Sequence, residues 1–127
     1  MKPKLLLTLA AIFWAFIGIL LQVAPIMAFG LDPNAPASLI ANLRVPASLL
    51  IALAVINWFA RDSDASKARD AIFLGNTVGF VLVAIFDILV LLIPGADPTG
   101  WVFVAIQLFF VVAFIMVGRT NMSTGTS

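Results

Sequence analysis

Four apolar runs of at least 18 residues constrain the fold of this chain more than any other feature. They cover residues 5–29, 38–60, 71–93 and 101–118. A helix rises about 1.5 Å per residue, so each run is long enough to cross the roughly 30 Å hydrocarbon core of a bilayer. The segments between the runs are short and rich in Pro, Gly or charged residues, so consecutive helices should be antiparallel neighbours. The sequence therefore predicts an all-α, up-down-up-down bundle of four transmembrane helices, with residues 1–127 forming a single membrane domain.

The composition agrees with a membrane protein and narrows the chemistry. The chain is 63% hydrophobic and 10% charged, whereas soluble domains are about half apolar and about a quarter charged. It contains no Cys, His or Tyr, which excludes disulfides, thiolate nucleophiles, imidazole catalysis and His-ligated haem. A net charge of +1 provides no basic face for nucleic acid. We therefore expect no catalytic residue, no metal site, no cofactor and no enzymatic activity.

The distribution of charge indicates the orientation. Apart from Arg44, every Lys and Arg lies on one side of the predicted bundle, and the opposite loops carry only Asp32 and Asp97 as charged residues. The positive-inside rule then places both termini and the middle loop in the cytoplasm, with the chain as a multi-pass membrane protein. The first run follows Lys2 and Lys4 and is longer than the apolar region of a typical signal peptide, so we expect it to be kept as a membrane anchor.

A faint internal repeat links the two halves of the chain. At an offset of 65 residues, the Gly-x-Asp-Pro segment at 30–33 falls on the same pattern at 95–98. Duplication of a helical hairpin would produce this match. Any two hairpins of similar length with basic starts and Gly-Pro turns would produce it as well, so both interpretations stay open.

Polar residues inside the apolar runs are the candidates for a site. Arg44 and Asp87 fall at similar depths on two helices that the topology makes adjacent. We predict an intramembrane ion pair between them, because an isolated charge in the bilayer is costly. Gln22, Gln107 and Ser48 would form a supporting polar layer. The alternative is that Arg44 extends outward to the lipid headgroups while Asp87 is neutral.

Small residues and aromatic residues predict how the helices pack. Gly18 and the Gly75-x-x-x-Gly79 motif should let neighbouring helices approach closely. The fourth run is rich in Phe instead, and we predict that it presents an outward face toward lipid or a partner protein. That face consists of Phe109, Phe110 and Phe114. Contact with a pigment or quinone through Phe and Trp stays open, without ligation through His.

Several segments resemble a group of small bacterial four-helix membrane proteins of unknown function. They are residues 57–61 (NWFAR), 74–80 (LGNTVGF) and 100–106 (GWVFVAI), and the resemblance extends over about residues 40–118. The resemblance implies the four-helix fold and a location in the bacterial inner membrane, and it assigns no activity. The chain departs from the group after Arg44, where Val45-Pro46-Ala47 replaces a glycine-containing stretch.

Two functions are compatible with these features. The short loops and the Phe-rich fourth run favour a non-catalytic accessory or scaffolding subunit that packs against a larger assembly of integral membrane proteins, in contact with membrane lipids. The buried polar layer favours the alternative, a small transporter or a protein that binds a small ligand or lipid and acts as a homo-oligomer.

Overall fold

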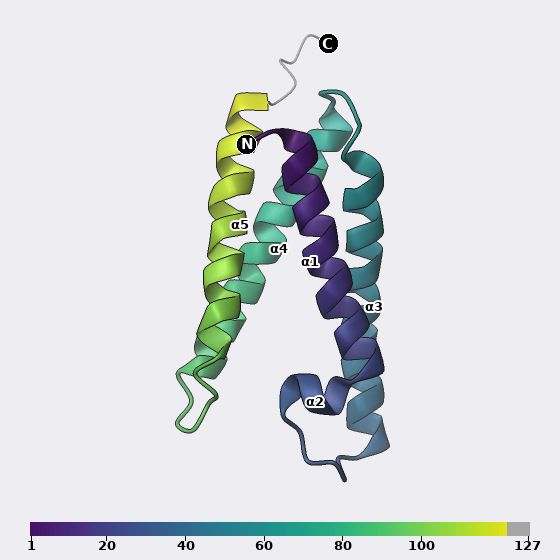
Figure 1. The fold of residues 1–127 in the computed structure, drawn as a ribbon, viewed down its shortest axis with the longest axis vertical. Helices are drawn as coiled ribbons and strands as arrows, with labels where there is room; N and C mark the ends of the chain where they lie inside the picture. Colours follow the sequence, from purple (N-terminus) through teal and green to yellow (C-terminus); the bar gives the residue numbers. More distant parts are fainter. Residues whose placement is uncertain (122–127) are drawn as a thin grey trace. The chain divides into compact units, whose positions relative to one another are not determined.

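The computed structural model describes residues 1–121, and this part of the chain is helical throughout, apart from its short connections. The helices are α1 (Pro3–Val23), α2 (Pro25–Phe29), α3 (Ala37–Ala60), α4 (Lys67–Leu91) and α5 (Gly100–Asn121) (Figure 1). All except α2 are long and apolar enough to cross a membrane. The predicted all-α fold with four membrane-length helices is therefore confirmed, and the chain is described below as a multi-pass membrane protein.

The first apolar run is divided into two helices, where the sequence predicts one. α1 ends at Val23, and the five-residue helix α2 follows. Pro25 causes this break, because its ring disfavours helical backbone in the residue before it. Ala24 accordingly has φ −134° and ψ 54°. Gly30 ends α2 with a φ of 59°, a left-handed conformation that glycine adopts readily.

The contacts of the chain separate it into two compact units. One unit is Leu7–Arg61, which contains most of α1 together with α2 and α3. In this unit α1 and α3 run antiparallel, since Gly18 lies against Ile51 and the later residue Gln22 bonds to the earlier residue Ser48. Small residues and one polar cluster therefore hold this hairpin together.

The other unit consists of Met1–Leu6 and the chain from Asp62 onward, and α4 and α5 form its antiparallel hairpin. Buried residues recur every three or four positions along both helices, which places them on one face of each helix. On α4 they are Phe73, Asn76, Phe80 and Ala84, and on α5 they are Val104, Gln107, Phe110, Ala113, Phe114 and Val117.

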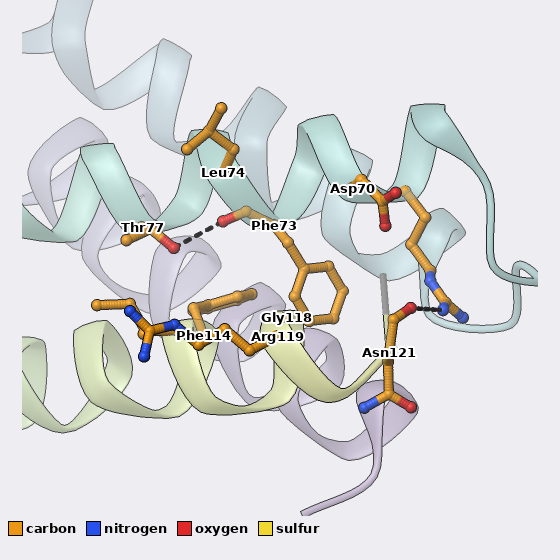
Figure 2. Close-up of a pocket in the computed structure, with 10 residues that line it drawn as sticks. Asp70, Phe73, Leu74, Thr77, Phe114, Gly118, Arg119 and Asn121 are labelled. Atoms are coloured by element: carbon orange, nitrogen blue, oxygen red, sulfur yellow. Dashed lines mark hydrogen bonds between the residues drawn. The ribbon is translucent and has the colours of Figure 1, made fainter. Parts of the chain in front are cut away.

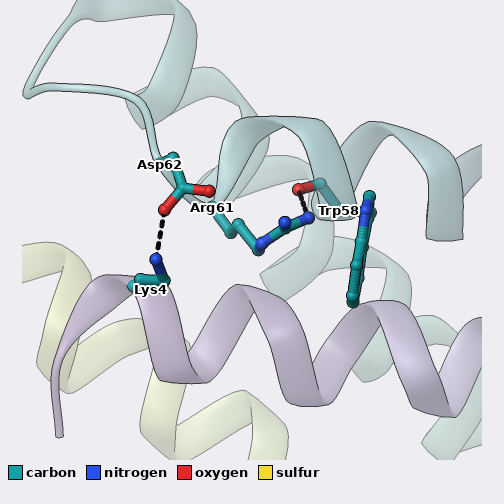
Figure 3. Close-up of polar contacts among 4 residues, drawn as sticks. All are labelled: Lys4, Trp58, Arg61 and Asp62. Carbon is teal, nitrogen blue, oxygen red and sulfur yellow. Dashed lines mark hydrogen bonds and ion pairs between the residues drawn. The ribbon is translucent and has the colours of Figure 1, made fainter.

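Polar contacts gather at one end of this second unit. Lys4 Nζ lies 2.5 Å from Asp62 Oδ1 (Figure 3), although both side chains are exposed and such pairs contribute little stability. Arg69 donates from Nη1 to the carbonyl of Ser63 and from Nη2 to the carbonyl of Asn121, at 3.0 and 2.9 Å. These bonds bring the start of the chain, the start of α4 and the end of α5 to one end of the unit, as the predicted topology requires.

The end of α3 carries a separate aromatic and basic contact. Arg61 Nη1 donates to the carbonyl of Trp58 at 2.6 Å, and its guanidinium carbon lies 3.7 Å from the centroid of the Trp58 ring (Figure 3). An indole with a cation over its face is typical of the membrane–water interface. The contact agrees with the predicted position of this helix end at the bilayer surface.

Candidate functional site

Asp87 and Gln107 form a side-chain hydrogen bond between α4 and α5. Gln107 Nε2 donates to Asp87 Oδ2 at 2.7 Å. Gln107 is only 3% exposed, whereas Asp87 is partly accessible. The predicted supporting role of Gln107 next to Asp87 therefore has a direct geometric basis.

The side-chain oxygen of Gln107 is the unusual atom of this pair. Gln107 Oε1 is buried and accepts no hydrogen bond from the described residues. A buried acceptor without a donor costs about 1–3 kcal/mol. The pair therefore leaves Gln107 Oε1 and the Asp87 carboxylate as acceptors, together with the second N–H of the Gln107 amide as a donor.

Gln22, Ser48 and the backbone of Arg44 form a second polar cluster, between α1 and α3. Gln22 Nε2 lies 2.6 Å from Ser48 Oγ and 3.1 Å from the carbonyl oxygen of Arg44. The Ser48 hydroxyl itself donates to the same carbonyl at 3.1 Å. The cluster flanks Pro46, which stays within α3.

The predicted ion pair is therefore divided between the two units. Arg44 belongs to the α1–α3 unit and Asp87 to the α4–α5 unit. Each has a polar partner within its own unit, Gln22 for the Arg44 carbonyl and Gln107 for the Asp87 carboxylate. The pairing of the two charges stays a prediction.

The three glycines predicted to serve helix packing differ in how closely other atoms approach them. A Cβ atom added at Gly18 would lie 2.8 Å from Ile51 Cγ1 and 3.0 Å from the carbonyl oxygen of Ala47, so α1 approaches α3 closely there, as predicted. A Cβ atom at Gly75 or Gly79 would meet nothing within 4 Å. These two glycines do not take part in the packing of α4 on α5, because α5 packs on the Phe73–Phe80 side of α4 instead, and their role in helix packing stays a prediction.

The outward face predicted for the fourth apolar run is wrong at two of its three positions. Phe110 and Phe114 are 5% and 1% exposed. Phe80 stacks on Phe110 with ring centroids 4.5 Å apart, and Phe73 meets Phe114 edge to face at 5.3 Å. Phe109 is 54% exposed, in agreement with the prediction. The two buried rings face α4 because large aromatic side chains fill this hairpin seam, where the prediction relied on small residues alone.

Two buried asparagines were not singled out by the sequence. Asn57 and Asn76 are fully buried, and each donates from Nδ2 at 2.9 Å to the carbonyl four residues earlier, that of Leu53 or Ile72. Because both lie near helix ends, the sequence alone predicts that water or lipid headgroups reach them. The signal that identifies them is the helical period, since Asn76 lies three residues after Phe73 and four before Phe80.

A groove opens at the polar end of the α4–α5 hairpin (Figure 2). Its volume is about 280 Å³. The apolar part is formed chiefly by Phe73, Leu74, Phe114 and Ile115, with Gly118 on the α5 side. Arg69 and Asp70 lie at one end of the groove, whereas the Arg119 side chain extends from the end of α5 past Phe114 toward Thr77 (Figure 2).

The two Gly-x-Asp-Pro loops share their local structure. Asp32 Oδ1 accepts the backbone N–H of Asn34 at 2.8 Å, and Asp97 Oδ1 accepts that of Thr99 at 2.9 Å. Both are the turns that an aspartate forms with the backbone two residues later. Thr99 also lowers the pKa of the Asp97 carboxyl, first through its backbone N–H and then through its hydroxyl, against a smaller opposing effect of desolvation.

In residues 1–121, no group of three or more His, Cys, Asp or Glu side chains could hold a metal ion. Comparisons with models of protein families, with curated proteins and with solved structures find no match for the chain. The resemblance to small bacterial four-helix membrane proteins therefore stays a prediction.

Proposed function

We propose that the chain is a non-catalytic accessory subunit of a bacterial inner-membrane assembly, which acts by packing against other integral membrane subunits. The observation that carries the proposal is the open face of α4. Gly75 and Gly79 lie on this face one turn apart, and no atom lies within 4 Å of the position that a Cβ would take at either one. In lipid, small residues at this spacing let a helix of a second protein approach the backbone closely.

The surroundings of the two glycines support a protein partner. Leu82 and Phe86 continue the same face at helical spacing and are 49% and 65% exposed. Phe109 adds an exposed aromatic ring on α5. Lipid alone can cover large apolar side chains, but two glycines leave a notch that a neighbouring helix fills with better van der Waals contact.

The proposal is tested by replacing the glycines and measuring the size of the complex. Tagged protein is extracted from its native membrane in a mild detergent, and the mass and subunits of the complex are determined. The wild-type chain should migrate with other membrane proteins, whereas Gly75→Leu and Gly79→Leu should release it. Ala105→Leu is the matched control, because it enlarges an exposed small residue on α5.

Two results would contradict the proposal. The first is a complex made only of copies of this chain, which would favour the homo-oligomeric alternative. The second is equal loss of the complex in the Ala105→Leu control and the glycine variants, which would show that any added bulk on the surface has the same effect.

A further inference from the structure

The groove between the start of α4 and the end of α5 combines an apolar surface with two arginines. Phe73, Leu74, Phe114 and Ile115 line its apolar surface, and Arg69 from the start of α4 and Arg119 from near the end of α5 line it as well. The arginines flank the apolar runs directly, since these runs begin at residue 71 and end at residue 118. Arginines in such positions lie at the level of the lipid headgroups. We propose that this groove binds one anionic phospholipid, with the phosphate at Arg119 and one acyl chain along the phenylalanines.

The charged side chains of the groove favour an anion with a single negative charge. The Arg119 guanidinium has no hydrogen-bond or ion-pair partner among residues 1–121, so its donors are available to a phosphate. Arg69 already donates to the carbonyls of Ser63 and Asn121 and is held in place by these bonds. Asp70 lowers the net charge of the groove to about +1, which suits the single negative charge of a phosphodiester.

The length of the groove fits an acyl chain. The α4 side extends from Arg69 to Thr77, about 12 Å along the helix at 1.5 Å per residue. One leaflet contributes about 15 Å of hydrocarbon. The groove therefore begins at headgroup depth and follows most of one leaflet. Its volume of about 280 Å³ holds part of a lipid while the rest lies in the bilayer.

The proposal is tested with purified protein and three probes. Thermal unfolding in detergent is followed by tryptophan fluorescence while dioctanoylphosphatidylglycerol, dioctanoylphosphatidylcholine or inorganic phosphate is added. The two lipids share their acyl chains and differ in net charge, and phosphate carries the anion alone. We expect phosphatidylglycerol to raise the midpoint temperature in a saturable way and the other two probes to have much weaker effects.

Three variants identify the site. Arg119→Gln should weaken the response to phosphatidylglycerol about tenfold or more, the size expected for the loss of a charged hydrogen bond. Gly118→Leu should weaken it without changing the charge, since a Cβ there meets Phe73 Cδ1 at an ordinary 3.6 Å and the larger side chain enters the groove. Lys67→Gln is the matched control, because it removes a positive charge from α4 outside the groove.

Several outcomes would overturn the proposal. Equal stabilisation by the two lipids would mean that the groove recognises only acyl chains, and equal stabilisation by phosphate would mean that it binds a free anion. An equal loss in Lys67→Gln and Arg119→Gln would assign the effect to the overall surface charge. If Gly118→Leu does not fold, the comparison of Arg119→Gln with Lys67→Gln still decides the result.

Discussion

Gln107 donates a hydrogen bond of 2.7 Å to the carboxylate of Asp87 and thereby joins α5 to α4 near the loop that connects them. Two turns of α4 away, Phe80 stacks on Phe110 in the same seam. The aromatic rings fill the space between the helices, while the hydrogen bond has a direction and is lost when one helix slides along the other. The polar pair therefore fixes the register of a seam whose contact area is mostly aromatic.

The first prediction is that Asp87 and Gln107 are energetically coupled. Asp87→Leu or Gln107→Leu alone leaves one polar group without its partner, whereas the double variant removes both. The double variant should therefore be more stable than the sum of the single effects predicts, with a coupling of about 0.5–1.5 kcal/mol, the range measured between membrane helices. The measurement is equilibrium unfolding in mixed micelles. As a control, Asp87→Leu is combined with Leu108→Ala at an exposed neighbour of Gln107, and their effects on the free energy of unfolding should add. If the effects of Asp87→Leu and Gln107→Leu also simply add, the coupling is contradicted.

The second prediction compares two adjacent phenylalanines. Phe110→Ala removes a ring stacked at 4.5 Å on Phe80, whereas Phe109→Ala removes one that is 54% exposed. In lipid, removing either apolar ring gains or loses little by solvation, so the two variants should differ in stability only through the packing contacts that each one loses. We expect Phe110→Ala to lower the free energy of unfolding by about 1–3 kcal/mol, below the roughly 3–5 kcal/mol typical of soluble cores. Phe109→Ala should change it by less than about 0.5 kcal/mol. Equal effects in the same unfolding assay would contradict the assigned faces.

The fold class follows from the sequence because length and hydropathy decide it. A run of 18 or more apolar residues has few alternatives to a membrane helix, since every backbone polar group must be bonded within the segment. The boundary at Val23 does not follow from hydropathy, because residues 5–29 are apolar throughout. It follows from the local backbone preference of the residue before Pro25. The sequence thus contains the signal for this boundary, but the length of the apolar run alone predicts one continuous helix.

The error at Phe110 and Phe114 has a similar origin. The sequence predicts Gln107 as part of a buried polar layer, and Phe110 and Phe114 lie three and seven residues after it on the same helix face. The helical period, counted from Gln107, therefore predicts that both rings lie in the seam between α4 and α5. The open space at Gly75 and Gly79 could not be foreseen, because a Gly-x-x-x-Gly motif does not specify whether its partner helix belongs to the same chain.

The third prediction compares the effects of alanine substitutions at two glycines, Gly18 and Gly79, on stability. Gly18→Ala places a Cβ atom 3.0 Å from the backbone oxygen of Ala47, and a backbone atom cannot yield without moving the helix. The variant should therefore lose about 1–3 kcal/mol of stability through overpacking. Gly79→Ala meets no atom within 4 Å and should be neutral or slightly stabilising, because alanine favours the helix. Thermal unfolding of both variants provides the comparison, and a neutral Gly18→Ala would argue against close packing of α1 on α3.

The fourth prediction concerns the pH dependence of the loop between α4 and α5. The hydrogen bonds from Thr99 lower the pKa of Asp97 in the folded chain. The turn is therefore fully stabilised above the unfolded pKa of about 3.9 and loses this contribution as the pH falls through the lower folded pKa. Thr99→Val removes the hydroxyl and keeps the backbone N–H, so it should raise the pKa part of the way. Carboxyl carbon shifts measured by NMR during an acid titration report both values. An unchanged pKa in Thr99→Val would exclude the hydroxyl as a cause.

The last prediction is the orientation of the chain in the membrane. The segments rich in Lys and Arg include residues 2–4, 61–69 and 119, and the loops at 30–36 and 94–99 contain neither residue type. Since positively charged loops are retained in the cytoplasm, alkaline phosphatase fused after Ser127 should be inactive and the same enzyme inserted after Asn34 should be active. Green fluorescent protein, which fluoresces only when it folds in the cytoplasm, should give the opposite pattern. An active phosphatase after Ser127 together with an inactive one after Asn34 would reverse the topology. The groove at Arg69 and Arg119 would then face the outer leaflet, because these residues lie at the same end of the hairpin as the end of α5.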